Sequence, residues 1–169
     1  MTVEAGTGLS DDPARHPDDD DQADKYLFAT ERFADAGLAW YEISNWAQPG
    51  RACRHNLLYW SLGEYAAIGC AAHGHRDGQR FWNLRTPERY LEAIEQGRSP
   101  VAADERLSAD ERRIEGLQLA LRTTDGVPAA ALPLADDPSL DRLVEVSGAR
   151  ARLTVAGRLL ANEVAVRLH

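Results

Sequence analysis

Residues 41–74 read YEISNWAQPGRACRHNLLYWSLGEYAAIGCAAHG, and most of what the sequence predicts depends on this stretch. Within it, residues 55–60 (HNLLYW) place an imidazole, a carboxamide, a phenol and an indole close together. Aromatic rings supply flat apolar surface for stacking, and a histidine supplies a metal ligand or a proton. This density of polar and aromatic side chains therefore predicts a site for a flat, partly apolar ligand.

The chain of 169 residues, 44% of them apolar, is long enough for one domain or two small ones. No apolar run approaches the roughly 18 residues of a membrane-spanning helix, and the acidic start is unlike a secretory signal. We therefore expect a cytoplasmic protein without a transmembrane segment. The two cysteines, Cys53 and Cys70, are expected to be free thiols rather than a disulfide.

The net charge of −8 is distributed unevenly along the chain. Residues 46–90 contain three acidic residues against six arginines, whereas residues 1–45 contain 11 acidic residues against three basic ones. Arginine binds carboxylates through two parallel hydrogen bonds, so the positive segment around the aromatic motif suits an acidic ligand. For any single arginine, a solvated position on the surface is the alternative.

The part before residue 100 is expected to combine helices and strands. The aspartates at 18–21 begin a helical pattern that ends at Gly37, and they stabilise the positive end of the helix dipole. A metal site is the less favoured interpretation of these aspartates, because divalent-ion loops need spaced ligands and a turn glycine. A strand over residues 38–43 follows, and a helix packed on the next strand is the half-unit of an α/β barrel or open sheet.

A hairpin is expected after the aromatic motif, which itself lies on a loop or a short helix. The Asp-Gly pair at 77–78 supplies the positive φ values of a type I′ turn. This turn joins an extended segment at 68–75 to a return strand at 81–83. A further helix then begins at Thr86 and ends at Gly97.

The C-terminal part has a different character. A capping box at 108–111 opens a helix, and a short helix is expected within residues 137–148. Residues 150–154 predict a small strand, and residues 157–168 predict a last amphipathic helix. This order of elements resembles a small winged-helix-like domain. The expected domains are therefore residues 1–100 and residues 101–169.

His55 is the strongest candidate for a functional side chain, because Arg54, Asn56, Tyr59 and Trp60 surround it in the sequence. A hydrogen-bonded structural histidine is the alternative. For Tyr59 and Trp60 a role in the core is equally favoured, and Asn56 could either orient the imidazole or cap a helix.

His73 and His75 are secondary candidates. They lie two positions apart in the expected hairpin, so both imidazoles point to the same face of the strand. Two ligands make an incomplete metal site, and no recognised spacing brings a cysteine to it. Cys70 is expected to be a small buried hydrophobic residue. Neither a phosphate-binding glycine motif nor a nucleophilic triad is identifiable, so no catalytic residue is assigned.

Several motifs resemble, in order and spacing, those of the HemW-type haem chaperones, a radical-SAM family related to oxygen-independent coproporphyrinogen III oxidase. The family motifs are VExGTxL, PxDDD, YEISN, PG, HNxxYW, GxGAH and LTxxGxLLA. The corresponding segments here are residues 3–9, 17–21, 41–45, 49–50, 55–60, 69–73 and 153–161. Two features depart from the family: Cys70 stands where proline or glycine is common, and the loop between Leu9 and Pro17 is shorter and less basic than usual.

The resemblance implies a fold of class α/β + α, namely the C-terminal remnant of a radical-SAM partial TIM-type barrel followed by a small winged-helix-like helical domain. The CxxxCxxC loop, which supplies three thiolates to a [4Fe–4S] cluster, does not occur in this sequence. We therefore expect a C-terminal piece that is not catalytic alone: a truncated product, a mis-called start or one half of a split protein. The cluster and S-adenosylmethionine are expected only on the missing N-terminal half.

The resemblance also implies haem binding and transfer, and imidazole can ligate haem iron directly. The expected haem-binding residues are His55, Asn56, Tyr59, Trp60 and Arg54, with His73 and His75 as secondary candidates. The expected partners are haem and haem-accepting proteins, together with either a second copy of the chain or the missing N-terminal half.

Three other functions are less favoured. The first is a fragment of oxygen-independent coproporphyrinogen III dehydrogenase, which removes two propionate carboxyls by radical chemistry. The second is a nucleic-acid-binding winged-helix module, which is disfavoured because residues 104–169 hold 11 acidic residues against nine arginines. The third is a fragment without an independent function.

Overall fold

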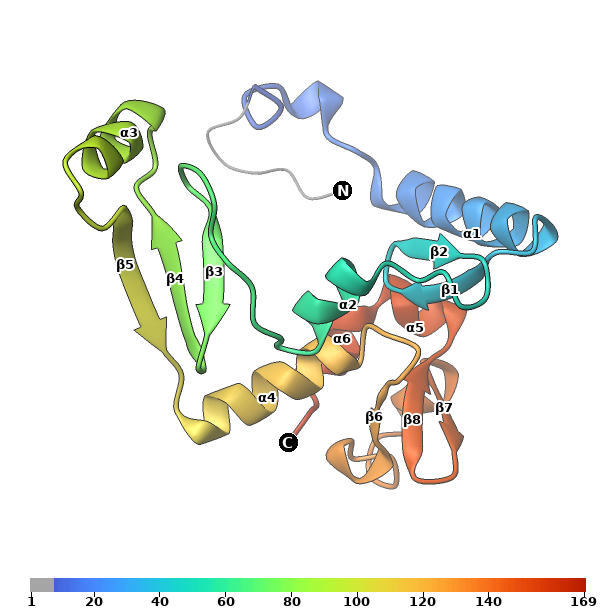
Figure 1. The fold of residues 1–169 in the computed structure, drawn as a ribbon. Coiled ribbons are helices and arrows are strands. Elements are labelled where there is room, and N and C mark those ends of the chain that lie inside the picture. The colour runs from blue at the N-terminus through green and yellow to red at the C-terminus, as the bar shows by residue number, and fades with distance from the viewer. Residues whose placement is uncertain (1–7) are drawn as a thin grey trace. The chain divides into compact units, whose positions relative to one another are not determined.

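The computed structural model describes residues 8–169, so most of the segment that resembles VExGTxL lies outside the described residues. The chain divides into two compact units, Met1–Arg51 and Ala52–His169. Figure 1 shows the order of their helices and strands. The predicted domain boundary at residue 100 stays a prediction.

A long helix dominates the first unit. Helix α1 (Asp19–Asp35) follows a short 3₁₀ helix, η1 (Pro13–Arg15). The carboxylate of Asp18 accepts a hydrogen bond from the backbone N–H of Asp21 at 2.9 Å, so the aspartates cap the helix as predicted. The predicted end of the helix at Gly37 is also confirmed, because this glycine adopts a φ of 75°.

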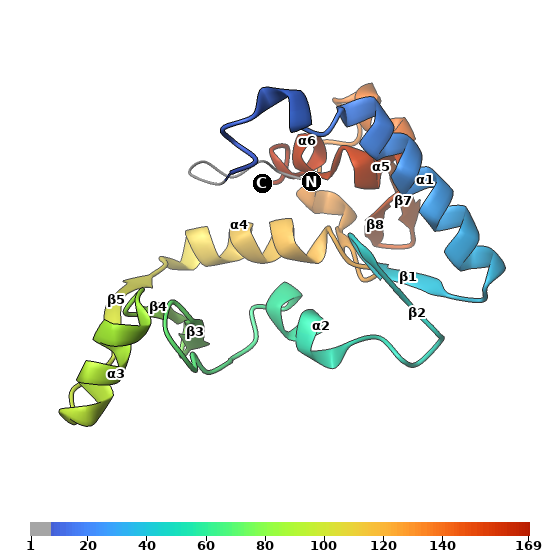
Figure 2. The same cartoon turned by 90° about the horizontal axis from the view of Figure 1, so that it is seen from above.

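A small antiparallel hairpin follows α1. Its strands are β1 (Ala39–Glu42) and β2 (Asn45–Ala47). The predicted strand at 38–43 is therefore confirmed, but its pairing with β2 was not predicted. The Trp46 ring centroid lies 5.5 Å from that of Tyr26 and 4.9 Å from that of Phe33, so aromatic contacts join the helix to the hairpin. Figure 2 shows the hairpin of β1 and β2 following the end of α1.

The second unit begins with a short helix and a three-stranded antiparallel sheet. The elements are α2 (Arg54–Trp60), β3 (His73–Arg76), β4 (Gln79–Asn83), α3 (Pro87–Glu95) and β5 (Val101–Arg106). The hairpin predicted around the Asp-Gly pair is confirmed, since Asp77 and Gly78 have φ values of 51° and 70°. The strand β5 was not predicted, because its residues are exposed along their whole length and carry no alternating apolar pattern.

The predicted extended segment at 68–75 is wrong for its first half. Residues 68–72 form a loop, in which Gly69 and Ala71 have positive φ values. The buried Asn83 fixes this loop, because its Nδ2 donates hydrogen bonds to the carbonyl oxygens of Ala67 at 3.3 Å and Gly69 at 2.9 Å. Backbone hydrogen bonds of 2.9 Å from Ala71 N–H to the Leu84 carbonyl and from Asn83 N–H to the Ala72 carbonyl join the end of this loop to the chain around Asn83.

A second three-stranded sheet lies in the C-terminal part. The elements are α4 (Ala109–Ala120), β6 (Val127–Pro128), η2 (Ala129–Ala131), η3 (Pro138–Arg142), β7 (Val144–Ser147), β8 (Arg150–Leu153), α5 (Val155–Leu159) and α6 (Ala161–Ala165). The strands pair antiparallel in the order β6-β8-β7. The capping box is confirmed: the Ser108 hydroxyl accepts the Glu111 N–H at 3.3 Å, and the Glu111 carboxylate accepts the Ser108 N–H at 2.8 Å.

Two helices of the C-terminal part differ from the predicted ones. Within residues 137–148 only η3 is helical, and β7 then forms a hairpin with β8, as its alternating valines at 144 and 146 favour. The predicted helix at 157–168 is divided into α5 and α6, which meet at Leu160, where φ is −113°. The predicted strand at 150–154 is confirmed as β8.

The described residues thus combine helices with three small antiparallel sheets, and they contain no closed barrel. Apart from Tyr41 and Ala93, every buried apolar side chain within residues 8–169 lies at or after Leu121. None of the helices in this range is long and apolar enough to cross a membrane.

Candidate functional site

The centre of the candidate site is one face of the short helix α2. His55 and Tyr59 are four positions apart, so their side chains lie on the same side of the helix. The Tyr59 hydroxyl lies 3.0 Å from Nε2 of His55, and the two rings meet edge to face with centroids 4.8 Å apart. Both residues are exposed, so this phenol–imidazole pair is accessible to a ligand.

Two more rings extend this face. The Tyr65 ring lies 4.5 Å from that of Tyr59, and the His75 ring on β3 lies 6.2 Å from that of Tyr65. Tyr65 and His75 also exchange two backbone hydrogen bonds of 2.9 and 3.0 Å, which fix their register. We call His55, Tyr59, Tyr65 and His75 the ring row.

The fold holds the two ring-row residues farther along the chain, Tyr65 and His75, in place. Nδ1 of His75 lies 2.9 Å from the carbonyl oxygen of Gly63, which can only accept, so Nδ1 carries a proton. Burial raises the pKa of Tyr65, the nearby Tyr59 adds to this effect, and Arg80 opposes it. Tyr65 is therefore a neutral phenol at physiological pH, half-buried behind the exposed pair.

The opposite face of α2 lines a cavity of about 460 Å³. The lining residues are Arg54, Leu57, Leu58, Trp60, Ser61, Ala120, Thr123, Asp125 and Arg150. Arg150 is held there by its own hydrogen bonds, from Nε to the Asp125 carbonyl at 3.0 Å and from Nη2 to the Gly126 carbonyl at 2.7 Å. The structure therefore divides the predicted residues: His55 and Tyr59 belong to the ring row, whereas Arg54 and Trp60 line this cavity.

The remaining candidates occupy other places. Asn56 is half-buried on α2. His73 pairs across the hairpin with Trp82, and their rings stack with centroids 5.9 Å apart. Although His73 and His75 share one strand, each ring has a different aromatic neighbour. Across the described part of the chain, no group of three His, Cys, Asp or Glu side chains is placed to hold a metal ion.

The cysteines are free thiols: Cys53 is exposed just before α2, and Cys70 is half-buried in the loop before β3, so the expectation that Cys70 is a buried hydrophobic residue is wrong. Tyr65 is the ring that sequence reasoning missed. It lies beyond residues 55–60, and its place beside His75 depends on a backbone bridge between a loop and a strand. The sparseness of aromatic residues, 7% of the chain, is the signal that could have drawn attention to it.

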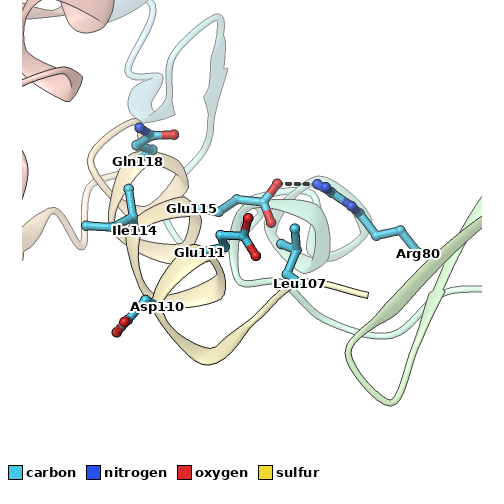
Figure 3. A pocket seen from close by; sticks show the side chains of 7 residues that line it. All are labelled: Arg80, Leu107, Asp110, Glu111, Ile114, Glu115 and Gln118. Carbon is cyan, nitrogen blue, oxygen red and sulfur yellow. Dashed lines mark hydrogen bonds and ion pairs between the residues drawn. The ribbon is translucent and has the colours of Figure 1, made fainter. Parts of the chain in front are cut away.

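A second cavity, of about 420 Å³, lies beside α4 (Figure 3). Its lining residues are Arg80, Leu107, Asp110, Glu111, Ile114, Glu115 and Gln118. Arg80 forms ion pairs with Glu105 at 2.6 Å and with Glu115. Burial of Arg80 works against its charge, but the hydrogen bonds and negative charges of Glu105 and Glu115 raise its pKa overall. This arginine of the positive segment is therefore paired within the protein.

The YEISN motif has a structural role in the first unit. Glu42 is almost fully buried, and its carboxylate accepts hydrogen bonds from the backbone N–H of Ser44 at 3.3 Å and from the side-chain amide of Asn45. The Tyr26 hydroxyl donates to the carbonyl of Ile43 at 3.0 Å. A buried carboxylate needs such donors, so these residues stabilise the turn between β1 and β2.

Comparison with known proteins identifies relatives along nearly the whole chain, although no family model matches it. The chain is 40% identical over 173 residues to the protein named Heme chaperone HemW of Mycobacterium tuberculosis, covering 97% of this chain and 44% of that protein. It is 30% identical over 161 residues to the protein of the same name of Bacillus subtilis, covering 88% of this chain and 42% of that protein. The chain thus spans less than half the length of these curated relatives.

The fold is similar to that of a solved structure. The coproporphyrinogen III oxidase HemN of Escherichia coli, described as a radical SAM enzyme, superposes with a TM-score of 0.69. The match covers 92% of this chain and 42% of that chain at 14% sequence identity. At this identity the similarity supports the fold and not the activity.

Proposed function

This chain belongs to the HemW family, of which it represents a C-terminal portion, and from that premise we propose that it binds haem and transfers it to other proteins. The relatives are named haem chaperones, so haem is the proposed ligand. The observation that carries the proposal onto this chain is the exposed phenol–imidazole pair of Tyr59 and His55 on α2. Imidazole and phenolate are both ligands of haem iron in proteins.

The proposed haem site is α2 with its surroundings. The ring row offers aromatic surface beside the iron-binding atoms, and porphyrins are flat and mostly apolar. Arg54 is exposed at the start of the helix, where its guanidinium can pair with a propionate carboxylate. Of the predicted haem-binding residues, His55 and Tyr59 are proposed to face the iron and Arg54 to pair with a propionate; Asn56 and Trp60, with His73 and His75 in secondary roles, stay predictions.

The family also implies a [4Fe–4S] cluster and S-adenosylmethionine. We assign both to a part of the protein outside this sequence, because the two cysteines present here cannot form a CxxxCxxC loop. The proposed partners are haem-accepting proteins and either a second copy of the chain or the half that carries the cluster. Absence of nucleic-acid binding and a cytoplasmic location remain predictions.

The C-terminal part is proposed to be a winged-helix-like domain. The sheet order β6-β8-β7, the preceding helix α4 and the hairpin of β7 and β8 support this assignment. The excess of acidic residues in this part favours a supporting role over nucleic-acid binding.

A second candidate function is that of a fragment of coproporphyrinogen III oxidase; the chain shares the fold of HemN, but at 14% identity this similarity supports the fold and not the activity. The two proposals differ in ligand. A haem chaperone binds an iron porphyrin with two propionate carboxylates, whereas the oxidase binds an iron-free porphyrinogen with four. We prefer the chaperone because the 40% identity to a HemW protein extends over 97% of the chain.

Haem titration of the purified chain, followed by the Soret absorbance, tests the proposal. Saturable binding is expected, and His55→Ala should weaken it by about tenfold or more, whether His55 touches the iron or supports Tyr59. His169→Ala is the matched control, because this exposed histidine lies at the end of the chain and outside the ring row. Absence of saturable binding in the unaltered chain would overturn the proposal.

Transfer is tested separately. The haem-loaded chain is mixed with an acceptor apoprotein whose holo form has a distinct spectrum, and haem should move to the acceptor faster than free haem dissociates from the chain. A transfer rate equal to the rate of haem dissociation from the chain would mean that the chain binds haem but does not transfer it directly to the acceptor.

A further inference from the structure

The hydrogen bond between Tyr59 and His55 bears on which of the two side chains contacts haem iron. Nε2 is the imidazole nitrogen farther from the backbone, and for a histidine on a helix it is the nitrogen best placed to reach a large ligand. In this structure Nε2 faces the Tyr59 hydroxyl at 3.0 Å. A nitrogen engaged in this way must give up its hydrogen bond before it can donate its lone pair to a metal.

The Tyr59 oxygen is under no such restriction. In the His55 tautomer that carries its proton on Nδ1, the Tyr59 hydroxyl donates to Nε2 and the phenol oxygen keeps its lone pairs for a metal; 41% of Tyr59 is exposed to solvent. The ring is also held in place, because it meets the His55 ring at 80° on one side and the Tyr65 ring at 66° on the other. Tyr59 is therefore both oriented and accessible before any ligand arrives.

We propose that Tyr59 supplies the axial ligand to ferric haem, and that His55, hydrogen-bonded to the phenol at 3.0 Å, is the positioning residue that orients it. This assignment rests on the proposed haem-binding function and goes beyond it by reversing the roles that sequence reasoning gives to the two residues. Tyrosinate is an established ligand of haem iron in another protein class, the catalases.

The step is a ligand binding without redox change. The phenol O–H bond of Tyr59 breaks, and its proton moves to Nε2 of His55, which becomes imidazolium. The oxygen lone pair then forms the bond to Fe(III). The imidazolium N–H donates a hydrogen bond back to the bound phenolate oxygen, and such a charge-assisted bond is stronger than the neutral one that it replaces.

Spectroscopy of ferric haem bound to the full chain distinguishes the two ligands. The unaltered chain should show a high-spin ferric electron paramagnetic resonance signal and a resonance Raman band of an iron–phenolate bond. Tyr59→Phe should lose both signatures and bind haem about tenfold or more weakly. Tyr90→Phe is the matched control: it removes a phenol of the same unit whose hydroxyl meets the Gly69 N–H at 3.3 Å, away from α2, and both signatures should remain.

His55→Ala completes the test. If Tyr59 is the ligand, this variant keeps the iron–phenolate band at reduced affinity, and His55→Gln restores part of the affinity because its amide can still hydrogen-bond Tyr59. If His55 is the ligand, Tyr59→Phe keeps an imidazole-type spectrum and His55→Ala loses it, which would overturn the assignment while leaving haem binding intact. Lack of haem binding by the unaltered chain would overturn the proposed function as well. Far-ultraviolet circular dichroism of each variant checks that α2 and the rest of the fold are retained.

Discussion

The C-terminal part, after Ser108, and the region around α2 differ in how deeply their large apolar and aromatic side chains are buried. In the C-terminal part, Leu121, Leu140 and Leu153 are almost completely buried. Around α2, the rings of the ring row are exposed or half-buried, although they contact one another closely. Burial of apolar surface stabilises the first region, so its sequence is largely explained by folding.

The exposed rings around α2 need another explanation. A ring that remains 41% exposed, as Tyr59 does, contributes only part of its burial free energy to folding. Its hydrogen bond to His55 is also solvent-accessible and adds little to stability. The C-terminal part therefore stabilises the fold, whereas the region of α2 presents reactive side chains that a ligand can reach.

Limited proteolysis of the full chain gives the broadest test of this comparison. We expect the first cuts within residues 1–60 and a resistant fragment that starts near residue 100. The physical reason is that α1 has no buried residue, whereas the C-terminal part has a closed core. Mass spectrometry of early time points identifies the cuts. First cuts inside residues 108–168, with the YEISN segment intact, would reverse the assignment of stability.

Truncation of a core leucine should have the largest effect of any single substitution. Leu153 is 1% exposed on β8, and Leu153→Ala should lower the free energy of unfolding by about 2–5 kcal/mol. Leu91→Ala is the matched control on α3, where Leu91 is 55% exposed, and its effect should stay within about 0.5 kcal/mol. Urea unfolding followed by circular dichroism measures both. Equal effects would show that the C-terminal core does not dominate stability.

The elements that could be predicted from the sequence are those whose signals are local. The aspartates before α1, the turn at Asp77 and Gly78, and the capping box at Ser108 each depend on a few neighbouring residues. The position of α2 as a short helix was also among the expected alternatives. These features need no knowledge of the rest of the fold.

The elements that were missed depend on distant partners. Residues 101–106 form strand β5 because they pair with β4, and residues 144–147 form strand β7 because they pair with β8. Tyr65 joins the ring row through its backbone bridge to His75. Sequence reasoning found the residue types of the candidate site, but the separation of His55 and Tyr59 from Arg54 and Trp60 follows from how α2 faces its neighbours.

Two helical glycines offer a sharper test of how closely the C-terminal part is packed. A Cβ on Gly157 in α5 would overlap the carbonyl oxygen of Leu143, so Gly157→Ala should destabilise the protein by about 1–3 kcal/mol. A Cβ on Gly116 in α4 would meet only Leu62 Cδ1, at 3.4 Å, so Gly116→Ala should stabilise by up to about 1 kcal/mol through helix propensity. Thermal unfolding compares the two variants. Effects of the same sign would show that packing at Gly157 is looser than the structure indicates.

The smallest effect concerns the capping box at the start of the C-terminal part. Removal of the hydroxyl in Ser108→Ala should cost about 1 kcal/mol of stability, because the Glu111 N–H then loses its acceptor.

The hydrogen bonds from Ser108 also lower the pKa of Glu111, so their contribution is present above the ordinary carboxyl pKa of about 4.3 and disappears as the pH falls through the lowered value. The stability difference between the unaltered chain and Ser108→Ala should therefore be constant near pH 7 and shrink below about pH 4. Urea unfolding midpoints across this range measure it, and Ser139→Ala, which removes the hydroxyl bonded to Asp137 at the start of η3, provides a second carboxylate of lowered pKa for comparison. A difference that grew toward low pH would contradict the protonation state inferred for Glu111.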